Sequence, residues 1–279
     1  MNTIAKFQIH KDVANALSED ILTGDLTAEL IPENTLLKTK IISRESAVIC
    51  GLQWLTTAFL QMDEDINVQC LVTDGELVQE NQTICTIDGN ARSILTAERT
   101  ALNFLQLLSG TATTAKKFAD KIHQLNTHTI ILDTRKTIPG LRLAQKYAIS
   151  CGGCHNHRKG LYDALLIKEN HIQACGSITQ AIVSAKNRYP DKTVEIEIEN
   201  ITELEEAIKA GVDIAMLDNF TLANIKQAVK INQGMIKLEI SGGVTFDSIA
   251  DIATIGVDYI SIGEITKDVK SIDFSMRFI

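Results

Sequence analysis

Six short apolar runs alternate with helix-like segments through the second half of this 279-residue chain. Alternating β and α segments of this size favour parallel strands joined by right-handed crossovers. The sequence therefore predicts either an α/β barrel or a doubly wound sheet. The runs are TIIL (129–132), ALLI (164–167), VEIEI (194–198), IAML (214–217), IKLEI (236–240) and YISI (259–262).

A polar cluster follows each run and helps to choose between these two folds. All strand ends of a barrel meet on one face, whereas a doubly wound sheet uses only one or two of them for a site. We therefore expect a barrel, and six clear strands make it incomplete and irregular compared with the usual eight. The clusters are Asp133-Thr134-Arg135-Lys136, Lys168-Glu169-Asn170-His171, Glu197-Ile198-Glu199-Asn200, Asp218-Asn219, Ser241-Gly242-Gly243 and Gly263-Glu264.

The first 125 residues do not show this regular alternation of apolar runs and helices. A short helix is expected over 9–18, and mostly β segments over 36–87 are interrupted by a helical period at 51–62. One helix over 95–108 should end at Ser109-Gly110, and a second is expected over 113–125. The predicted fold is α/β, with a sandwich-like N-terminal α/β domain over 1–108 and a barrel domain over 109–266.

Composition excludes several classes of protein. The start lacks an apolar core for a secretory signal, and the longest uncharged stretch, 46–62, is too short and polar to span a bilayer. We expect a cytoplasmic protein that does not bind membranes, with its six cysteines reduced. The net charge of −8 argues against a nucleic-acid surface, yet residues 133–171 carry seven basic and three acidic residues. This cationic island predicts a site for a small polyanion.

Three groups of residues in the strand-end clusters carry recognisable chemistry. The late loops with Ser241, Gly242 and Gly263 are typical of a barrel phosphate site. Glu197 and Asp218 suit Mg²⁺ or ribose hydroxyls, although alternation alone leaves open which of Glu195, Glu197 and Glu199 faces the pocket. The third group is cationic and indicates a ligand with several anionic groups: Arg135, Lys136, His157, Arg158 and Lys168.

The Cys151-Gly-Gly-Cys154 motif admits a zinc or redox interpretation, with His155, His157 and Cys175 as further ligands. A zinc site usually shows a second clean pair of ligands, which is not visible here. We therefore favour a tight turn that presents His157 and Arg158.

Long stretches of the chain resemble the quinolinate phosphoribosyltransferase family. They are TAERTALNFLQLLSGTAT (96–113), DTRKTIPGLRLAQKYAISCGGCHNHRKGLYDALLIKENHI (133–172), EIEIEN (195–200), MLDNF (216–220), LEISGGV (238–244) and GVDYISIGEIT (256–266). The resemblance implies transfer of a phosphoribosyl group from phosphoribosyl pyrophosphate to quinolinate with Mg²⁺. The products are nicotinate mononucleotide, pyrophosphate and CO₂, as a step of NAD synthesis. It also implies a C-terminal tail, 267–279, that returns to the N-terminal domain.

The resemblance assigns roles to individual positions. Arg99, Arg135, His157, Arg158 and Lys168 would bind quinolinate. Lys136, Glu197 and Asp218 would handle phosphoribosyl pyrophosphate and Mg²⁺, and Ser241, Gly242 and Gly263 would hold the 5′-phosphate. It implies a homodimer whose active sites are shared between subunits, Arg99 entering the neighbour's pocket, and leaves higher assembly open.

One departure and three alternatives accompany this resemblance. Cys154 stands where the family usually has glycine, which strains the loop if φ there is positive. A paralogue of the same fold, of the molybdenum-transport-associated type, is the nearest alternative. Lys168 could instead form a Schiff base in a barrel aldolase, which leaves the arginines unexplained. A catalytically silent binding protein is disfavoured because every expected site position is retained.

Overall fold

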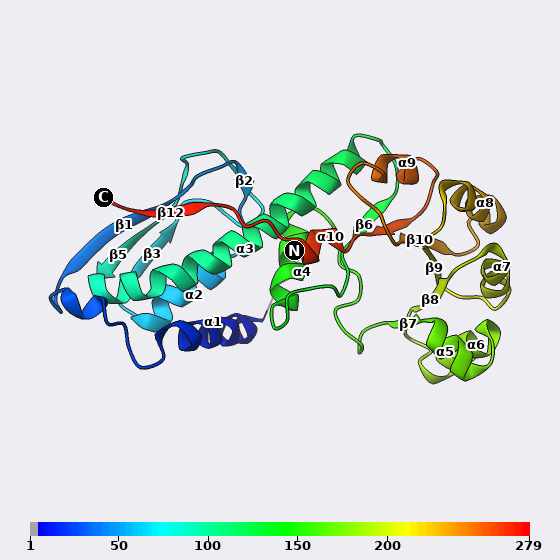
Figure 1. Ribbon diagram of the computed structural model, residues 1–279, viewed down its shortest axis with the longest axis horizontal. Coiled ribbons are helices and arrows are strands. Elements are labelled where there is room, and N and C mark those ends of the chain that lie inside the picture. The colour runs from blue at the N-terminus through cyan, green and yellow to red at the C-terminus, as the bar shows by residue number, and fades with distance from the viewer. Residues whose placement is uncertain (1–4) are drawn as a thin grey trace. The chain divides into compact units, whose positions relative to one another are not determined.

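The computed structural model describes residues 5–279, and the chain divides into two compact units (Figure 1). The first comprises Met1–Lys117, Thr137–Gly153 and Ile265–Ile279, and the second comprises Phe118–Lys136 and Cys154–Glu264. The domain boundaries expected from the sequence stay a prediction. Each unit is described by itself below.

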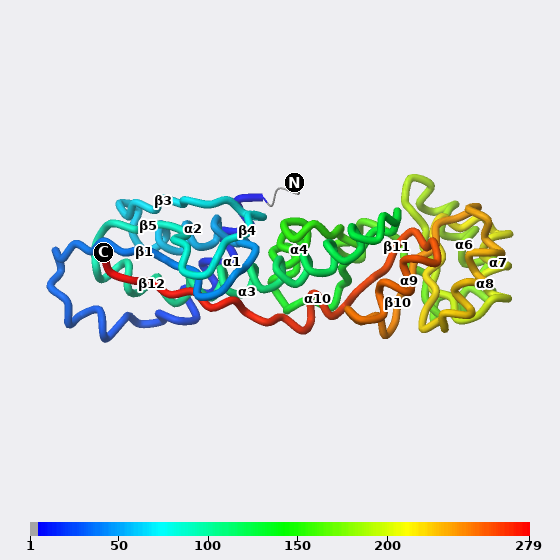
Figure 2. The backbone as a smooth tube through the Cα atoms, turned by 90° about the horizontal axis from the view of Figure 1, so that it is seen from above, coloured from blue at the N-terminus to red at the C-terminus, as the bar shows by residue number. Residues whose placement is uncertain are grey.

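An antiparallel sheet organises the first unit. Its strands follow the order β12 (Phe274–Phe278), β1 (Leu36–Ser43), β5 (Thr83–Asn90) and β3 (Asn67–Cys70). The last strand of the chain therefore pairs with the first long one, Ile41 lying opposite Met276. Figure 2 shows this C-terminal strand running beside β1. A separate short pair joins β2 (Ala47–Val48) to β4 (Leu77–Val78).

The helices of the first unit enclose an apolar core with the sheet. Trp54 and Phe59 of α2 (Leu52–Met62) are buried in the same core as Leu105 of α3 (Ala91–His123) and Ile87 of β5. The helical period at 51–62 is thus confirmed as α2. The remaining helices are α1 (Lys6–Ile21), the 3₁₀ turn η1 (Ala28–Leu30), α4 (Arg142–Cys151), which we did not foresee, and α10 (Glu264–Lys267).

The prediction of two helices broken at Ser109-Gly110 is wrong, because α3 runs unbroken through both residues. Gly110 does not act as a helix stop. A Cβ at this position would lie 2.2 Å from the carbonyl oxygen of Lys270, so glycine lets the C-terminal segment pack directly on the helix. The Ile272 N–H then donates to the Gln106 carbonyl at 3.2 Å.

Six parallel strands form the sheet of the second unit, and all six correspond to the predicted runs. Their order is β6 (Ile130–Leu132), β11 (Tyr259–Ser261), β10 (Lys237–Ser241), β9 (Ile214–Asp218), β8 (Val194–Ile198) and β7 (Leu165–Ile167). Within residues 5–279, β6 and β7 do not pair with each other, and on the side away from β11 the strand β6 makes only an isolated bridge, Leu132 to His155, so the barrel is incomplete, as expected. The six carboxyl ends share one edge of this sheet.

Helices connect these strands, and side-chain caps fix where several of them begin. Ser177, Asn200 and Thr221 each accept a backbone N–H three residues on, at the starts of α6 (Ile178–Arg188), α7 (Ile201–Lys209) and α8 (Leu222–Asn232). α9 (Ile249–Ala253) is shorter than its predicted segment. α5 (Glu169–Cys175) was not foreseen, because its first turn lies in the polar cluster after β7.

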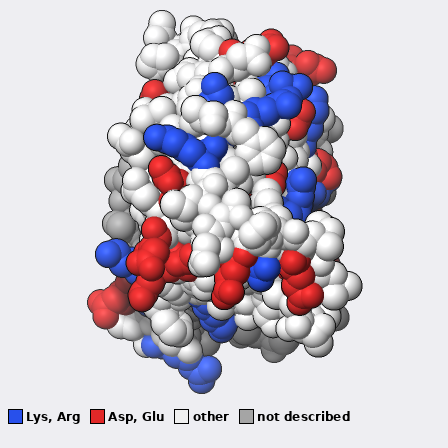
Figure 3. Space-filling model, turned by 90° about the vertical axis from the view of Figure 1, so that its left-hand side faces the viewer, with Lys and Arg blue, Asp and Glu red and all other residues white. Residues whose placement is uncertain are grey.

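Charged side chains of both signs are interspersed among uncharged residues on the face of the described residues drawn in Figure 3. This face therefore presents no field of a single sign. In the part of the chain that the structure covers, no helix has both the length and the apolar character to cross a bilayer.

Candidate active site

The carboxyl ends of the second unit's strands enclose a cavity of about 660 Å³. Parallel strands deliver their terminal residues to one edge of the sheet, so clusters far apart in sequence converge there. Nine of the predicted site residues line this cavity: Arg135, Lys136, His157, Arg158, Lys168, Glu197, Asp218, Ser241 and Gly242.

Two predicted residues do not line the cavity. Gly263 lies beside it: a Cβ there would come 3.1 Å from the Cδ of Lys136, so glycine leaves room for that lysine. Arg99 belongs to the first unit, where it is exposed on α3 and lines a separate hollow of about 220 Å³ with Glu19 and Asp20. Its predicted role in a neighbouring subunit stays a prediction.

A buried carboxylate shapes the basic side of the cavity. Asp133, directly after β6, is fully buried and accepts the His157 N–H at 2.9 Å and the Asn156 Nδ2–H at 2.8 Å. Burial, followed by the positive charge of Arg135, lowers the pKa of Arg158. Two guanidinium groups thus share one edge of the pocket. We did not assign a role to Asp133, although an acid at a strand end was the available signal.

The acidic side of the cavity comes from β8 and β9. Burial, and then the negative charge of Glu197, raise the pKa of Asp218, and Asn219 Nδ2 donates to its carboxylate at 2.7 Å. The Lys168 ammonium is bonded to Glu197. Carboxylate oxygens that repel one another across a half-open pocket are a donor set that Mg²⁺ prefers, with water and substrate oxygens completing its shell. The residues present therefore fit a divalent cation.

The loop after β10 requires its glycines. Gly242 has φ +90°, and a Cβ there would lie 2.2 Å from Asn219 Oδ1. Gly243 has φ +60°, with no atom near its missing Cβ. Side chains are disfavoured at such φ values, and the exposed backbone can approach an anion.

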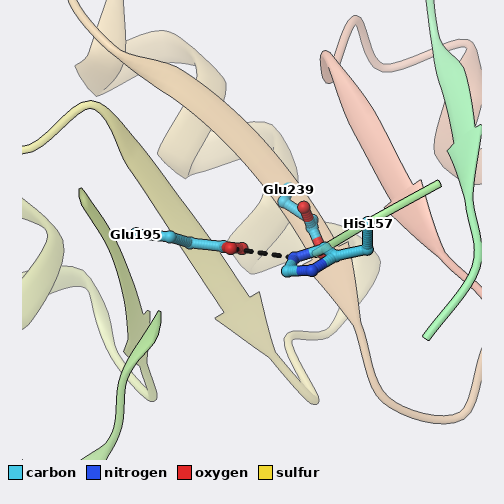
Figure 4. A group of neighbouring side chains, drawn as sticks. All are labelled: His157, Glu195 and Glu239. Carbon is cyan, nitrogen blue, oxygen red and sulfur yellow. Dashed lines mark ion pairs between the residues drawn. The ribbon is translucent and has the colours of Figure 1, made fainter. Parts of the chain in front are cut away.

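Beneath the basic side lies a polar group that we did not predict as a unit (Figure 4). His157 Nε2 is 2.8 Å from Glu195 Oε2 and 3.6 Å from Glu239 Oε1, and Ser261 Oγ is bonded to Glu239. Glu195 and Glu239 are almost fully buried. Three ligand atoms of His157, Glu195 and Glu239 lie within 4.8 Å of one another, the spacing that a metal site would also need.

This arrangement settles which acid of β8 faces the cavity. Glu197 lines the cavity and Glu195 lies deeper, whereas Glu199 lies past the strand and is exposed. Among the described residues, Glu197 is the one of these three that pairs with a lysine, whereas Glu195 contacts His157.

The Cys-Gly-Gly-Cys segment forms a turn. Gly153 has φ +87°, and a Cβ on Gly152 would lie 2.3 Å from the Ala112 carbonyl oxygen. Cys154 is not among the described residues with positive φ, so the departure from the family glycine introduces no strain there. Burial, and then the charge of Asp133, raise the pKa of the Cys154 thiol to about 12, which keeps it protonated.

Comparison with known proteins adds independent evidence. Residues 25–109 match the model of the quinolinate phosphoribosyl transferase N-terminal domain, and residues 111–277 match that of its C-terminal domain. A Bacillus subtilis protein described as a probable nicotinate-nucleotide pyrophosphorylase [carboxylating] is 38% identical over 96% of this chain and 93% of its own length.

Two further relatives agree. A Nicotiana tabacum protein, quinolinate phosphoribosyltransferase [decarboxylating] 2a, mitochondrial, is 37% identical over 94% of this chain and 80% of its own. The solved nicotinate-nucleotide pyrophosphorylase from Francisella tularensis superposes with a TM-score of 0.96 and 47% identity, covering 100% of this chain and 98% of that one.

Proposed function

The chain belongs to the quinolinate phosphoribosyltransferase family, and we propose that it joins quinolinate to phosphoribosyl pyrophosphate with loss of CO₂. The products are nicotinate mononucleotide and pyrophosphate, a step of NAD synthesis. One observation carries this proposal to the level of residues: a single cavity is lined by three cations, Arg135, Arg158 and Lys168, and by two carboxylates, Glu197 and Asp218. We call the cations its cationic edge and the carboxylates its acidic edge, and the two edges meet where Lys168 contacts Glu197. Each edge suits one of the two substrates.

The cationic edge would bind quinolinate. A pyridine with two adjacent carboxylates loses much hydration on entering a pocket, and guanidinium and ammonium groups offset that cost. Lys168 is bonded to Glu197, so a carboxylate of quinolinate would take over that cation. The exchange would leave Glu197 available for the second substrate.

The acidic edge and the glycine loop would bind phosphoribosyl pyrophosphate. Gly242 and Ser241 would present backbone and hydroxyl groups to the 5′-phosphate. Glu197 and Asp218 would hold Mg²⁺, which when bound supplies positive charge to the leaving pyrophosphate. Lys136, whose side chain passes over Gly263, would add a point charge to the same phosphates.

The chemistry asks for positioning and charge rather than a protein nucleophile. The quinolinate nitrogen forms a bond to ribose C1 as the bond to pyrophosphate breaks, and the carboxylates of Glu197 and Asp218 face the positive charge that develops on the ribose. The ring nitrogen is then cationic. The bond from C2 to its carboxylate breaks, CO₂ leaves, and the electron pair left at C2 beside that nitrogen takes up a proton.

Three finer features belong to this proposal. The enzyme would work in the cytoplasm as a homodimer, and each site would include Arg99 of the other subunit. Arg99 supports this by being exposed on α3, free to reach another chain. A paralogue acting on another substrate would also have this fold. The cationic edge, built for a dicarboxylate, favours quinolinate.

The Schiff-base alternative receives no support from the cavity. A lysine that attacks a carbonyl is activated by an apolar pocket or by a neighbouring cation, whereas Lys168 is half exposed and contacts the carboxylate of Glu197. The alternative also gives Arg135 and Arg158 no role.

Incubation of the protein with quinolinate, phosphoribosyl pyrophosphate and Mg²⁺ tests the function. We expect nicotinate mononucleotide to form, and to stop forming when EDTA removes the Mg²⁺. Absence of the nucleotide with all three present would refute the proposal.

A further inference from the structure

His157 makes two hydrogen bonds that together report where its proton lies. The backbone N–H of Arg158 donates to Nδ1 at 2.8 Å. The other ring nitrogen, Nε2, is 2.8 Å from Glu195 Oε2. A ring nitrogen that accepts an N–H cannot itself carry a proton, so an uncharged ring has its proton on Nε2, where Glu195 can accept it. The proton is therefore assigned to Nε2 from its partners.

We propose that His157 is uncharged, with its proton on Nε2, and that it acts as a positioning residue for Arg158 rather than as one of the cations that bind the substrate. Under this proposal His157 would not belong to the cationic set predicted from the sequence. Its importance for substrate binding rests on the proposed function, whereas its tautomer does not. The dicarboxylate would then be matched by Arg135, Arg158 and Lys168, together with Arg99.

The charges around the ring do not require a positive imidazole. Glu195 and Glu239 face it from β8 and β10, Asp133 holds its backbone N–H, and Arg158 follows it in the chain. Burial, and then the charge of Glu195, raise the pKa of Glu239 to about 8, so Glu239 is largely protonated at neutral pH. Glu195 and Asp133 are the other carboxylates beside His157, and Arg158 feels the charges of both Arg135 and Glu195. A charged ring would carry a second proton on Nδ1, and this proton would face the Arg158 N–H, so two donors would oppose each other.

The loop around His157 shows why its ring matters for Arg158. Four successive backbone N–H groups are held by side-chain acceptors: that of His157 by Asp133, that of Arg158 by the His157 ring, and those of Lys159 and Gly160 by Asp163. The His157 ring is in turn anchored on Glu195. These hydrogen bonds thus fix the backbone of Arg158, whose side chain lines the cavity. A fixed backbone lowers the entropy lost when a substrate carboxylate binds.

Substitutions at His157 separate positioning from charge. In His157→Asn the amide oxygen can still accept from Arg158, without any charge. In His157→Lys a positive charge is present, but the acceptor for the Arg158 N–H is lost. We expect the KM for quinolinate to rise less than about tenfold in the asparagine variant and roughly 100-fold in the lysine variant, since one buried hydrogen bond is worth about tenfold or more. The KM for phosphoribosyl pyrophosphate should stay near that of the wild type in both.

Substitutions of Glu195 also distinguish an uncharged positioning ring from a charged one. In Glu195→Gln the acid becomes an amide. Its amide oxygen can still accept from Nε2, which is all that the uncharged ring needs, whereas a charged ring would lose its counter-ion. We expect a small rise in the KM for quinolinate, about threefold or less, and a larger rise in Glu195→Leu, which lacks an acceptor. The opposite order at either residue, lysine better than asparagine or leucine no worse than glutamine, would overturn the positioning role.

Long-range ¹H–¹⁵N NMR of the histidine-labelled protein tests the tautomer directly. The signal lost in His157→Gln identifies the residue among the six histidines of the chain. We expect an uncharged ring protonated on Nε2 at pH 7. Protons on both nitrogens at neutral pH, or one on Nδ1, would overturn the proposal. Because this measurement needs no substrate, its result stands apart from that of the activity assay.

Discussion

The ammonium group of Lys168, at the end of β7, is bonded to the carboxylate of Glu197 at the end of the neighbouring strand β8. Both side chains line the cavity that we propose as the active site. If the cavity binds quinolinate as we propose, binding rearranges this ion pair rather than filling a preformed cationic pocket. Because the pair is partly exposed, it contributes little to folding stability.

Lys168→Ala and Arg135→Ala should lower kcat/KM for quinolinate by orders of magnitude, because each removes a charge that meets a substrate carboxylate. Lys237→Ala is a matched control: Lys237 pairs with Asp258 at 2.7 Å and begins β10, so it lies at the opposite end of the strands. Kinetics and circular dichroism together check this prediction. Loss of the fold in either active-site variant, or equal activity loss in the control, would contradict it.

The loop after β10 offers a second matched pair. Gly242→Ala should raise the KM for phosphoribosyl pyrophosphate and lower kcat, because its Cβ meets Asn219 Oδ1 and displaces the backbone. Gly243→Ala shares the positive φ but has open space for its Cβ, so it should show only the milder cost of backbone strain, about 1 kcal/mol. Steady-state kinetics with phosphoribosyl pyrophosphate varied decide this. Equal effects of the two substitutions would argue against a tight loop.

Glu239 predicts a pH dependence of folding. Its pKa rises from the ordinary 4.5 to about 8 in the folded protein. Between these values the folded chain keeps a proton that the unfolded chain has released, so the free energy of unfolding falls as pH rises. The slope from this one group is at most about 1.4 kcal/mol per pH unit. Glu239→Gln should remove it.

Urea unfolding at pH 5.5, 6.5 and 7.5 measures that slope for the wild type and for Glu239→Gln. Glu205→Gln, an exposed substitution on α7, is the control and should leave the slope unchanged. A Glu239→Gln protein whose stability falls with pH as steeply as the wild type would show that Glu239 is already ionised.

The sequence predicted the second unit well because each strand is an apolar run that ends in polar residues. Those ends have to meet at one edge of a parallel sheet, which placed Lys168, Glu197 and Asp218 in one cavity. Other features depend on contacts that no local pattern records. Gly110 looks like a helix stop until Lys270 is seen to pack against it.

The buried group of His157, Glu195 and Glu239 could not be predicted from the sequence either. Glu239 lies within an apolar run, and nothing local shows that it is buried beside Glu195 and Ser261. Alternation places Glu195 and Glu197 on one side of β8, but only depth in the sheet separates the buried residue from the cavity residue. The charge of His157 likewise depends on the partners of its ring nitrogens, and those partners come from its neighbour Arg158 and from Glu195.

Sharing of sites between subunits can be tested by mixing two inactive variants. Arg99→Ala and Lys168→Ala lie in different units of the chain. In a mixed dimer with shared sites, one site carries both substitutions and the other carries neither. Random exchange makes half of the dimers mixed, so co-refolding should restore about a quarter of the wild-type activity. No recovery, when the wild type refolds under the same conditions, would place Arg99 in its own subunit's site.

The measurement that tests the central claim most directly follows the 2-carboxyl group of quinolinate. With isotope in that carboxyl group, phosphoribosyl pyrophosphate and Mg²⁺, we expect labelled CO₂ and pyrophosphate in equal amounts and an unlabelled nucleotide. Nicotinate, the matched substrate without that carboxylate, should be used roughly 10- to 100-fold less well, because it leaves cations of the filled pocket without a partner, at about 1–3 kcal/mol each. Label that stays in the nucleotide, or nicotinate used as well as quinolinate, would contradict the account.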